Sequence, residues 1–242
     1  MSVAATYAPN RYHRVQMNTV SLNNAHTKAL VGASLKGYSL HCIIFRTATD
    51  FACGTGGFII SWLKALESQK KTVEDRAAFD TSVYGIEKKQ FPYMLCVTNL
   101  LLHDIDTPRV YHDNSLLKDV LDYTEDDQFD VLLMNPPYGG SEKTEVKNHF
   151  PSDLASSETA DLFMSVIMYR LKQNGRAAVI LPDGFLFGTD NAKVAIKKKL
   201  MSEFNLHTVI RMPHSVFAPY TSITTNTVSY THLRAHETDS YL

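Results

Sequence analysis

The sequence has few cysteines and no long apolar run. Its three cysteines, Cys42, Cys53 and Cys96, form neither a CxxC motif nor a paired framework, which excludes a small domain held together by disulfide bonds. The sequence also shows no secretory signal peptide and no apolar run of membrane-spanning length. A reducing cytoplasm is therefore the expected location, and a membrane is not an expected partner.

The sequence also lacks an excess of basic residues. Its formal net charge is −1, with 24 Lys and Arg against 25 Asp and Glu, whereas a strongly basic nucleic-acid-binding domain would carry more Lys and Arg. Any contact with DNA must then come from a local patch or through a partner. The ten histidines show no spacing typical of metal ligands, so no metal is expected.

Short apolar runs alternate with segments of helical periodicity from about Thr47 onward. With 242 residues, 44% of them hydrophobic, the chain is long enough for one domain with a sizeable core. The expected strands are near-continuous apolar runs: residues 47–49, 82–87, 109–113, 129–135, 176–182 and 206–213. The expected helices lie between them: residues 59–66, 91–105, 159–175 and 191–204.

This alternation predicts an α/β fold with a doubly wound, mostly parallel sheet that helices cover on both faces. Ligands of such sheets bind beyond the carboxyl ends of the strands. The loops that leave the strands should therefore share one edge of the sheet. These loops follow Thr49, Glu87, Asp113, Asn135 and Pro182.

A glycine-rich turn, DFACGTGGF at residues 50–58, stands where a strand meets a helix. Glycines allow a tight turn and a close approach of the backbone to a ligand, and the helix N-terminus offers free N–H groups to a carboxylate or phosphate. Glu87, at the end of the next strand, is placed to accept hydrogen bonds from ribose hydroxyls. A simple tight turn and a solvated surface acid are the alternatives. Together, the two features favour a ligand that contains a nucleoside.

The strongest apolar run ends abruptly in NPPYGG, residues 135–140, where prolines stop the strand. The segments DFACGTGGF, GIE, DNSL and NPPYGG occur in an order and spacing that resemble S-adenosylmethionine-dependent N6-adenine DNA methyltransferases. Residues 84–106 and 135–188 are similar to the modification (M) subunit of type I restriction-modification systems. The resemblance covers roughly residues 47–227 and implies the Rossmann-like fold of these methyltransferases.

The resemblance gives the NPPY residues a chemical role. The exocyclic amine of adenine is a poor nucleophile because its lone pair is delocalised into the ring. Asn135 Oδ1 and the Pro136 carbonyl would each accept one amine hydrogen, which frees the lone pair for methyl transfer. Tyr138 would stack on the flipped base. Pro137 and Phe185 are expected to line the base pocket, although Phe185 also fits a core position.

The resemblance also implies how the chain holds S-adenosylmethionine. The methionine part would lie near Asp50, Ala52, Gly54 and Gly56. The ribose is expected on Glu87. The adenine amine of the cofactor is expected on Asp113, but a carboxylate that caps its own turn is an alternative there, and neighbouring Asn114 could replace it.

The expected partners are DNA and the specificity and restriction subunits of a type I complex, in which the specificity subunit reads the target site. Two alternatives stay open. Methylation of a glutamine in a protein uses the same Asn-Pro-Pro-Tyr logic, because a planar amide poses the same problem. The chain would otherwise be a truncated fragment that binds the cofactor weakly or not at all.

The two ends of the sequence do not fit the family pattern, so the fold is expected to be incomplete at both ends. Residues 1–46 lack clear periodicity and are interpreted as an irregular or mistranslated segment, in which only residues 7–11 faintly resemble the family. Residues 47–227 are expected to form the catalytic domain. Residues 228–238 resemble the translation of a sequencing adapter, so residues 228–242 are expected to be a non-native tail, with residues 229–242 poorly packed.

Overall fold

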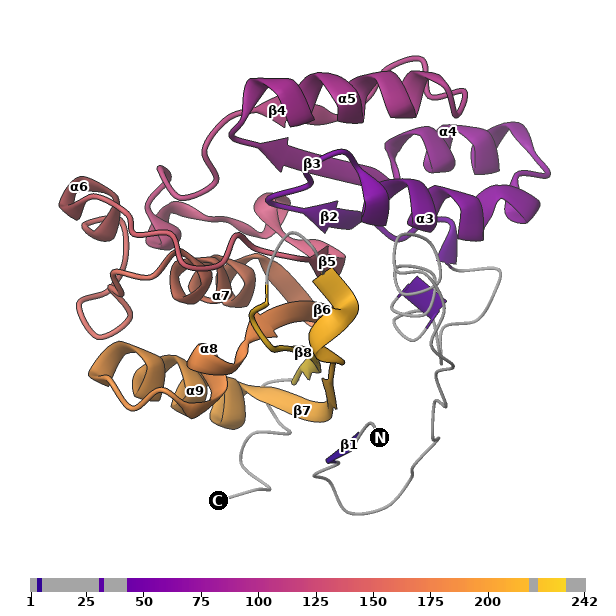
Figure 1. Ribbon diagram of the computed structural model, residues 1–242. Coiled ribbons are helices and arrows are strands. Elements are labelled where there is room, and N and C mark those ends of the chain that lie inside the picture. The colour runs from indigo at the N-terminus through magenta and orange to yellow at the C-terminus, as the bar shows by residue number, and fades with distance from the viewer. Residues whose placement is uncertain (1–3, 6–30, 33–42, 218–221, 234–242) are drawn as a thin grey trace.

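The computed structural model describes residues 4–5, 31–32, 43–217 and 222–233. These residues form one sheet with the strand order β1-β7-β8-β6-β5-β2-β3-β4 (Figure 1). The strands are β1 (Ala4–Ala5), β2 (Ala48–Asp50), β3 (Val83–Glu87), β4 (Val110–His112), β5 (Phe129–Met134), β6 (Leu171–Pro182), β7 (Phe204–Arg211) and β8 (Thr225–His232). No helix in the described part is long and apolar enough to cross a membrane.

Five neighbouring strands of the sheet confirm the expected parallel arrangement. In the order β4-β3-β2-β5-β6, each strand is parallel to its neighbours, and β8 then lies antiparallel between β6 and β7. Every residue of β5 is buried. Val131 and Leu133 belong to one hydrophobic core and Leu132 and Met134 to another, because successive side chains of a strand point to opposite faces.

Helices cover both faces of the sheet, as a doubly wound fold requires. On one face, α3 (Gly57–Leu66), α4 (Val73–Thr81) and α5 (Gln90–Leu101) contribute to the core that contains Trp62. On the other face, α7 (Thr159–Arg170) and α9 (Asn191–Glu203) contribute to the core that contains Phe163. Two short helices, α6 (Thr144–Lys147) and α8 (Asp183–Phe187), follow β5 and β6 (Figure 1).

The helix expected over residues 159–175 is shorter than its periodicity suggests. Helix α7 ends at Arg170, and β6 begins at once with Leu171. Leu171 is fully buried and pairs with Phe129 of β5. Residues 171–175 therefore belong to the sheet, although their periodicity also fits a helix. Asn174, which the periodicity assigned to the helix, lies in β6 with a left-handed φ of 60°.

Parts of the segment before residue 47 contribute to the core. Val31, Ile43 and Ile44 are almost completely buried in the cluster that contains Trp62. The Arg46 guanidinium also pairs with Asp130 at 2.7 Å. The segment at residues 7–11 that faintly resembles the family lies outside the described residues.

Strand β8 contradicts the expectation that residues 229–242 are poorly packed. Val228 and Tyr230 are fully buried, and the Tyr230 ring packs edge-on against Phe204 at 5.4 Å. The His232 ring stacks on Phe204, and its Nδ1 lies 2.8 Å from the Leu171 carbonyl oxygen. The expectation is therefore wrong for residues 229–232, while residues 234–242 lie outside the described part. The non-native origin of the tail stays a prediction.

The packing of β8 leads to a test with two substitutions. Tyr230→Ala should lower the free energy of unfolding by about 3–5 kcal/mol, as for other large core aromatics. Tyr230→Phe should leave it unchanged or raise it, because the buried Tyr230 hydroxyl has no hydrogen-bond partner among the described residues. Urea unfolding measures both, with the neighbouring Thr231→Ala as control. If Tyr230→Ala lowers the free energy of unfolding no more than Thr231→Ala does, residues 229–232 are poorly packed after all.

Candidate functional site

The carboxyl ends of β2, β3, β4 and β5 lie at one edge of the sheet. Asp50 at the end of β2 pairs with Gly85 of β3, and Glu87 at the end of β3 pairs with His112 of β4. Strand β5 runs parallel on the other side of β2 and ends directly before Asn135. The expected meeting of these loops at one edge is confirmed, so the glycine turn and the NPPY segment are neighbours.

Two glycines of the turn after β2 are needed for different reasons. Gly54 and Gly56 have φ values of 57° and 86°, in the left-handed region that favours glycine. A Cβ at Gly56 would lie 2.7 Å from Cys96 Sγ of α5, whereas a Cβ at Gly54 would meet nothing within 4 Å. Gly56 therefore lets the start of α3 approach α5, and Gly54 borders open space where a ligand can reach the backbone.

Glu87 holds the glycine turn in place with its carboxylate. Its side chain is buried, and Oε2 accepts a hydrogen bond from the Gly54 N–H at 2.9 Å. Oε1 accepts a second bond from the Lys89 N–H at 2.7 Å. A carboxylate has about four acceptor positions, so each oxygen keeps one for a ligand hydroxyl. The sequence indicated the position of Glu87 but not these two bonds to the backbone.

Asp50 is a buried carboxyl that forms no ion pair with a described Lys or Arg. Its Oδ1 accepts a hydrogen bond from the Ala52 N–H at 3.0 Å. Burial raises the pKa of Asp50 to about 8, the Ala52 bond opposes this shift, and the nearby Glu87 charge adds to it. A cationic ligand group would therefore favour the ionised form. No cluster of three His, Cys, Asp or Glu side chains that would suit a metal ion occurs in the described residues.

The side chain of Asp113 is exposed and engaged in its own turn. Its Oδ1 accepts a hydrogen bond from the Asn114 N–H at 2.7 Å, and Asn114 Oδ1 accepts one from the Leu116 N–H at 3.2 Å. The Asp113 N–H donates to the Glu87 carbonyl at 3.2 Å. The bonding therefore matches the turn-capping alternative, and a contact of Asp113 with an adenine amine stays a prediction.

Ser115 connects two of the loops at this edge, and sequence reasoning missed it. Its buried hydroxyl donates to the Phe51 carbonyl at 2.6 Å. This bond ties the loop after β4 to the glycine turn after β2. The small polar residue two positions after Asp113 is the only signal in the sequence, and serine in a turn is too common to identify such a link.

The NPPY segment begins at the end of β5. Asn135 and Tyr138 are half-buried, Pro136 is buried and Pro137 is exposed. The Tyr138 hydroxyl donates a hydrogen bond to Asn135 Oδ1. Burial raises the pKa of Tyr138 above its ordinary value, so the hydroxyl keeps the proton that it donates. The amide oxygen of Asn135 is therefore oriented to accept a hydrogen from a neighbouring donor.

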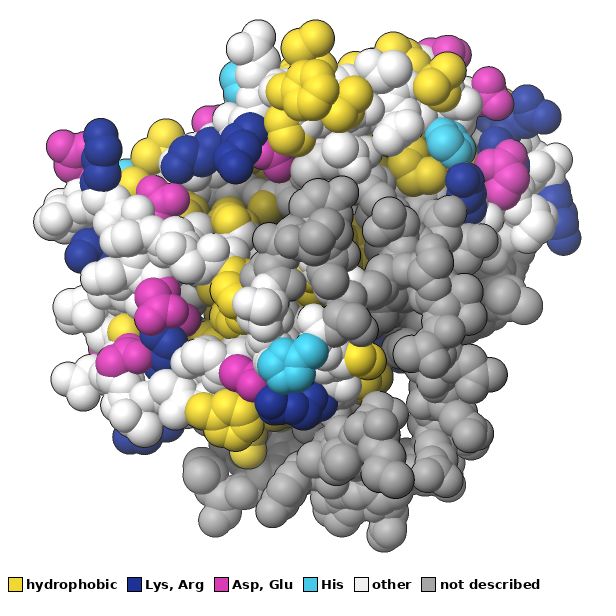
Figure 2. All heavy atoms as spheres, in the orientation of Figure 1, with side chains coloured by type: hydrophobic (Ala, Val, Ile, Leu, Met, Phe, Trp, Pro, Cys, Tyr) yellow, Lys and Arg dark blue, Asp and Glu magenta, His cyan; other side chains and the backbone are white. Residues whose placement is uncertain are grey.

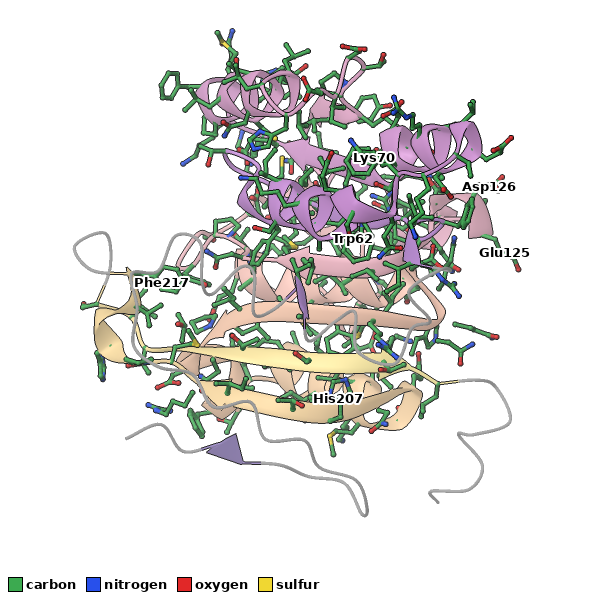
Figure 3. The ribbon with its side chains drawn as sticks, turned by 90° about the vertical axis from the view of Figure 1, so that its right-hand side faces the viewer. Trp62, Lys70, Glu125, Asp126, His207 and Phe217 are labelled. Atoms are coloured by element: carbon green, nitrogen blue, oxygen red, sulfur yellow. The ribbon has the colours of Figure 1, made fainter. Side chains whose placement is uncertain are left out.

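The Phe217 ring packs against the Tyr138 ring. The two rings lie 6.3 Å apart in an edge-to-face arrangement. Figure 3 shows Phe217 at one end of the sheet and Glu125 at the opposite end. Sequence reasoning did not identify Phe217, because its contact with Tyr138 joins segments that are far apart along the chain.

The loop after Tyr138 is attached to two other elements. The Thr159 N–H at the start of α7 donates to the Gly140 carbonyl at 3.0 Å. A Cβ at Gly140 would lie 2.6 Å from Thr159 Oγ1, so only glycine fits there without displacing Thr159. Glu142 pairs with Lys88 at 3.3 Å. Lys88 directly follows Glu87, so this ion pair joins the NPPY loop to the loop after β3.

Phe185 takes the core position that the sequence left open as the alternative to the base pocket. Its side chain is fully buried in the core that contains Phe163, which agrees with the core alternative. Helix α8 has little more than one turn, and its geometry turns Phe185 inward and leaves Phe187 69% exposed. Pro137 remains at the edge beside Asn135, and its contact with a base stays a prediction.

The buried Asp50 carboxyl should give stability a specific pH dependence. The folded chain keeps a proton on Asp50 up to about pH 8, whereas an ordinary carboxyl releases it near 3.8. Between these values the unfolded state binds fewer protons, so stability should fall as the pH rises, by about 1.4 kcal/mol per unit relative to Asp50→Asn. Urea unfolding of both proteins from about pH 5 to 8 measures this. The exposed Asp126→Asn serves as control, and parallel curves for Asp50→Asn and the unchanged chain would contradict the shift.

The comparison with protein families gives one clear match. The family model described as N-6 DNA methylase matches residues 45–241. The matched range contains the glycine turn, Glu87 and the NPPY segment, which are the features that the fold brings to one edge.

Curated relatives point to the same family. The methylase subunit of the type I restriction enzyme EcoEI from Escherichia coli is 47% identical over 184 residues, which cover 75% of this chain and 37% of that protein. The MpnII methylase subunit from Mycoplasma pneumoniae is 30% identical over 193 residues, which cover 73% of this chain and 34% of that protein. The chain thus spans little more than a third of the length of these relatives.

Solved structures agree with this result. A structure described as a modification subunit of a type I restriction enzyme from Vibrio vulnificus superimposes with a TM-score of 0.77 at 40% identity, covering 85% of this chain and 43% of that one. A class I S-adenosylmethionine-dependent methyltransferase from Listeria monocytogenes, at 16% identity, matches with a TM-score of 0.65 over 90% of this chain and 64% of that one, which supports the fold alone. The expected Rossmann-like methyltransferase fold is confirmed, and the chain belongs to the N-6 DNA methylase family.

Proposed function

We propose that this chain is the catalytic part of a type I modification subunit and transfers a methyl group to the N6 amine of adenine in DNA. The observation that carries this proposal is the orientation of Asn135, whose Oδ1 accepts a hydrogen bond from Tyr138 beside the glycine turn. The family match and the names of the relatives support the same reaction. Because the chain spans only part of these relatives, their activity is proposed here for the site and not for a whole enzyme.

The edge of the sheet fits S-adenosylmethionine. Asp50 is buried without a described cationic partner, which suits the ammonium group of the methionine part. The open space over Gly54 and the N–H groups near Ala52 and Gly56 would receive its backbone. Glu87 would accept the ribose hydroxyls. Asp113 is proposed for the adenine amine. When bound, the cofactor supplies an electrophilic methyl group.

Asn135 and Pro136 would activate the target amine by orientation. Asn135 Oδ1 and the Pro136 carbonyl each accept one hydrogen, which draws the nitrogen out of conjugation with the ring and exposes its lone pair. In the free chain the Tyr138 hydroxyl takes one of the two acceptor positions of Asn135 Oδ1 and leaves the other to the target amine. The Tyr138 ring would stack on the flipped base next to Pro137.

DNA is proposed as the substrate, with a specificity subunit and a restriction subunit as partners. On the face seen in Figure 2, Lys and Arg side chains are interspersed with Asp and Glu, and the formal net charge of the sequence is −1. Phosphate contacts supply most non-specific DNA affinity. A mixed surface of this kind suits a subunit that relies on a partner to hold and read the DNA.

Asn135→Ala tests the proposed reaction. Transfer of a labelled methyl group to adenine-containing DNA, measured with a specificity subunit present, should fall by at least about a hundredfold. Cofactor affinity measured by calorimetry should hardly change, because Asn135 belongs to another loop. If Asn135→Ala transfers the methyl group as fast as the unchanged chain, the mechanism is refuted. If the labelled methyl group appears on a protein glutamine, the alternative substrate is favoured. If the unchanged chain does not bind the cofactor, it is an inactive fragment.

Tyr138 should affect binding of the base. Tyr138→Phe should change methyl transfer only slightly, because the ring stays, whereas Tyr138→Ala should weaken binding of the base by about 1–3 kcal/mol.

Glu87→Gln tests the cofactor site. Replacing the charge weakens hydrogen bonds to ribose hydroxyls, at a cost of about 1.5–3 kcal/mol, which raises the dissociation constant roughly ten- to hundredfold. Thermal unfolding must be measured in parallel, because Glu87 also holds the Gly54 and Lys89 N–H groups. Glu125→Gln, at the opposite end of the sheet (Figure 3), is the matched control. An unchanged dissociation constant for Glu87→Gln would exclude the ribose role.

A further inference from the structure

The loop that follows NPPY depends on a short segment before α7 for its position. The Thr159 N–H donates to the Gly140 carbonyl at 3.0 Å, and the Glu142 N–H donates to the Ser157 carbonyl at 3.2 Å. Ser141 forms an antiparallel bridge with residue 158 between these two bonds. The proline end of the loop is fixed by β5, and this bridge fixes the other end.

Buried side chains hold that segment in turn. The Ser156 hydroxyl donates to Asp161 Oδ2 at 2.6 Å and accepts from the Glu158 N–H at 3.1 Å. Both Ser156 and Asp161 are buried, Asp161 completely. The hydrogen bonds therefore bind residues 156–158 to the first turn of α7.

Lys193 supplies the positive charge for this group of carboxylates. Its ammonium lies 2.7 Å from Glu158 Oε1, 3.0 Å from Asp161 Oδ2 and 3.1 Å from Asp190 Oδ2. Only 4% of its side chain is exposed, and each of its three N–H donors has a carboxylate acceptor. Lys193 belongs to the first turn of α9, which lies beside α7 (Figure 1), so the ion pairs connect the two helices.

The Lys193 stem packs closely against Gly188. A Cβ at Gly188 would lie 2.4 Å from Lys193 Cδ, so a larger residue there would displace the lysine. Asp190 also accepts a hydrogen bond from the Lys193 N–H at 3.0 Å and thereby caps α9. The lysine is thus fixed at its backbone, along its stem and at its charged end.

Removing a single charge from this group should destabilise the fold. Asp161 Oδ1 has no hydrogen-bond partner among the described residues. Burial raises the pKa of Asp161, while the bonds from Ser156 and Lys193 oppose the shift. Removing Lys193 would leave a fully buried carboxylate without a counterion, which is strongly unfavourable. Glu158 would at the same time lose its ion pair with Lys193 and turn toward water, since its side chain is already half-exposed.

We propose that Lys193 is a positioning residue for the NPPY loop. Through Glu158 and Asp161 it holds the segment that bonds to Gly140 and Glu142, and so it keeps Asn135 in its productive orientation without touching any substrate. The catalytic consequence rests on the proposed function, whereas the effect on the loop does not. The role is distinct from the cofactor site, because no contact links Lys193 to Asp50 or Glu87 among the described residues.

The test compares Lys193→Met with Lys193→Arg and with a double variant. Hydrogen exchange read by mass spectrometry should show the Glu142 and Thr159 amides exchanging at least about tenfold faster in Lys193→Met. Peptides over residues 50–57 should be unchanged. In the complex with a specificity subunit, kcat for methyl transfer should fall about a hundredfold, as for a small misplacement of a reacting group, with the cofactor dissociation constant unaltered. Lys193→Arg should retain most of the loop protection.

The double variant Lys193→Met/Asp161→Leu separates positioning from general stability. Removing both buried charges should restore the melting temperature, but the loop should still exchange fast and kcat should stay low, because Glu158 has lost Lys193 and Ser156 has lost its Asp161 acceptor. Lys199→Met, which removes an ion pair to Glu203 on the same helix, is the control. Unchanged exchange at Glu142 and Thr159 in a folded Lys193→Met or double variant would overturn the proposal, even if the chain transfers no methyl group at all. Recovery of loop protection together with stability in the double variant would also overturn it.

Discussion

The parallel pairing of β5 with β2 and β6 is the constraint on which the site depends. All residues of β5 are buried, and its side chains supply both cores in alternation. The pairing cannot continue past Asn135, because Pro136 and Pro137 have no N–H to donate. A strand that is fixed on both sides and stopped by prolines delivers Asn135 to a defined point. The glycine turn reaches the same edge because β2 is the direct neighbour of β5.

Buried acids give this edge its chemical character. Asp50 and Glu87 lie close enough for the charge of Glu87 to raise the pKa of Asp50 further, in addition to the effect of burial. Glu87 is satisfied by the Gly54 and Lys89 N–H groups, whereas Asp50 has one backbone bond and no described cation. The edge therefore suits a ligand with a positive group and hydroxyls side by side. The other buried acid, Asp161, differs from Asp50 because the chain itself supplies its cation, the Lys193 ammonium.

Local patterns in the sequence predicted the parallel α/β sheet, the glycine turn and the positions of Asp50, Glu87 and Asn135, because turns and periodicity are short-range signals. They did not predict features that depend on contacts between residues far apart in the sequence. Tyr230 was assigned to a loose tail, since serine and threonine hide its alternation with Val228. Phe185 was left between a base pocket and a core position, because no sequence pattern tells which way a one-turn helix points a side chain. The ion pairs of Lys193 join two helices and leave no local pattern.

The loop beyond Tyr138 is held at several points, and this fixes the surroundings of Asn135. Asn135 directly follows β5, and its Oδ1 accepts a hydrogen bond from the Tyr138 hydroxyl. An amide oxygen has two acceptor positions, so one stays open to a donor at the edge of the sheet. The Phe217 ring packs against Tyr138, and the bonds of residues 157 and 159 hold the loop near Gly140. In the reaction proposed for this chain, Asn135 could therefore accept a hydrogen of the target amine while the loop keeps its position.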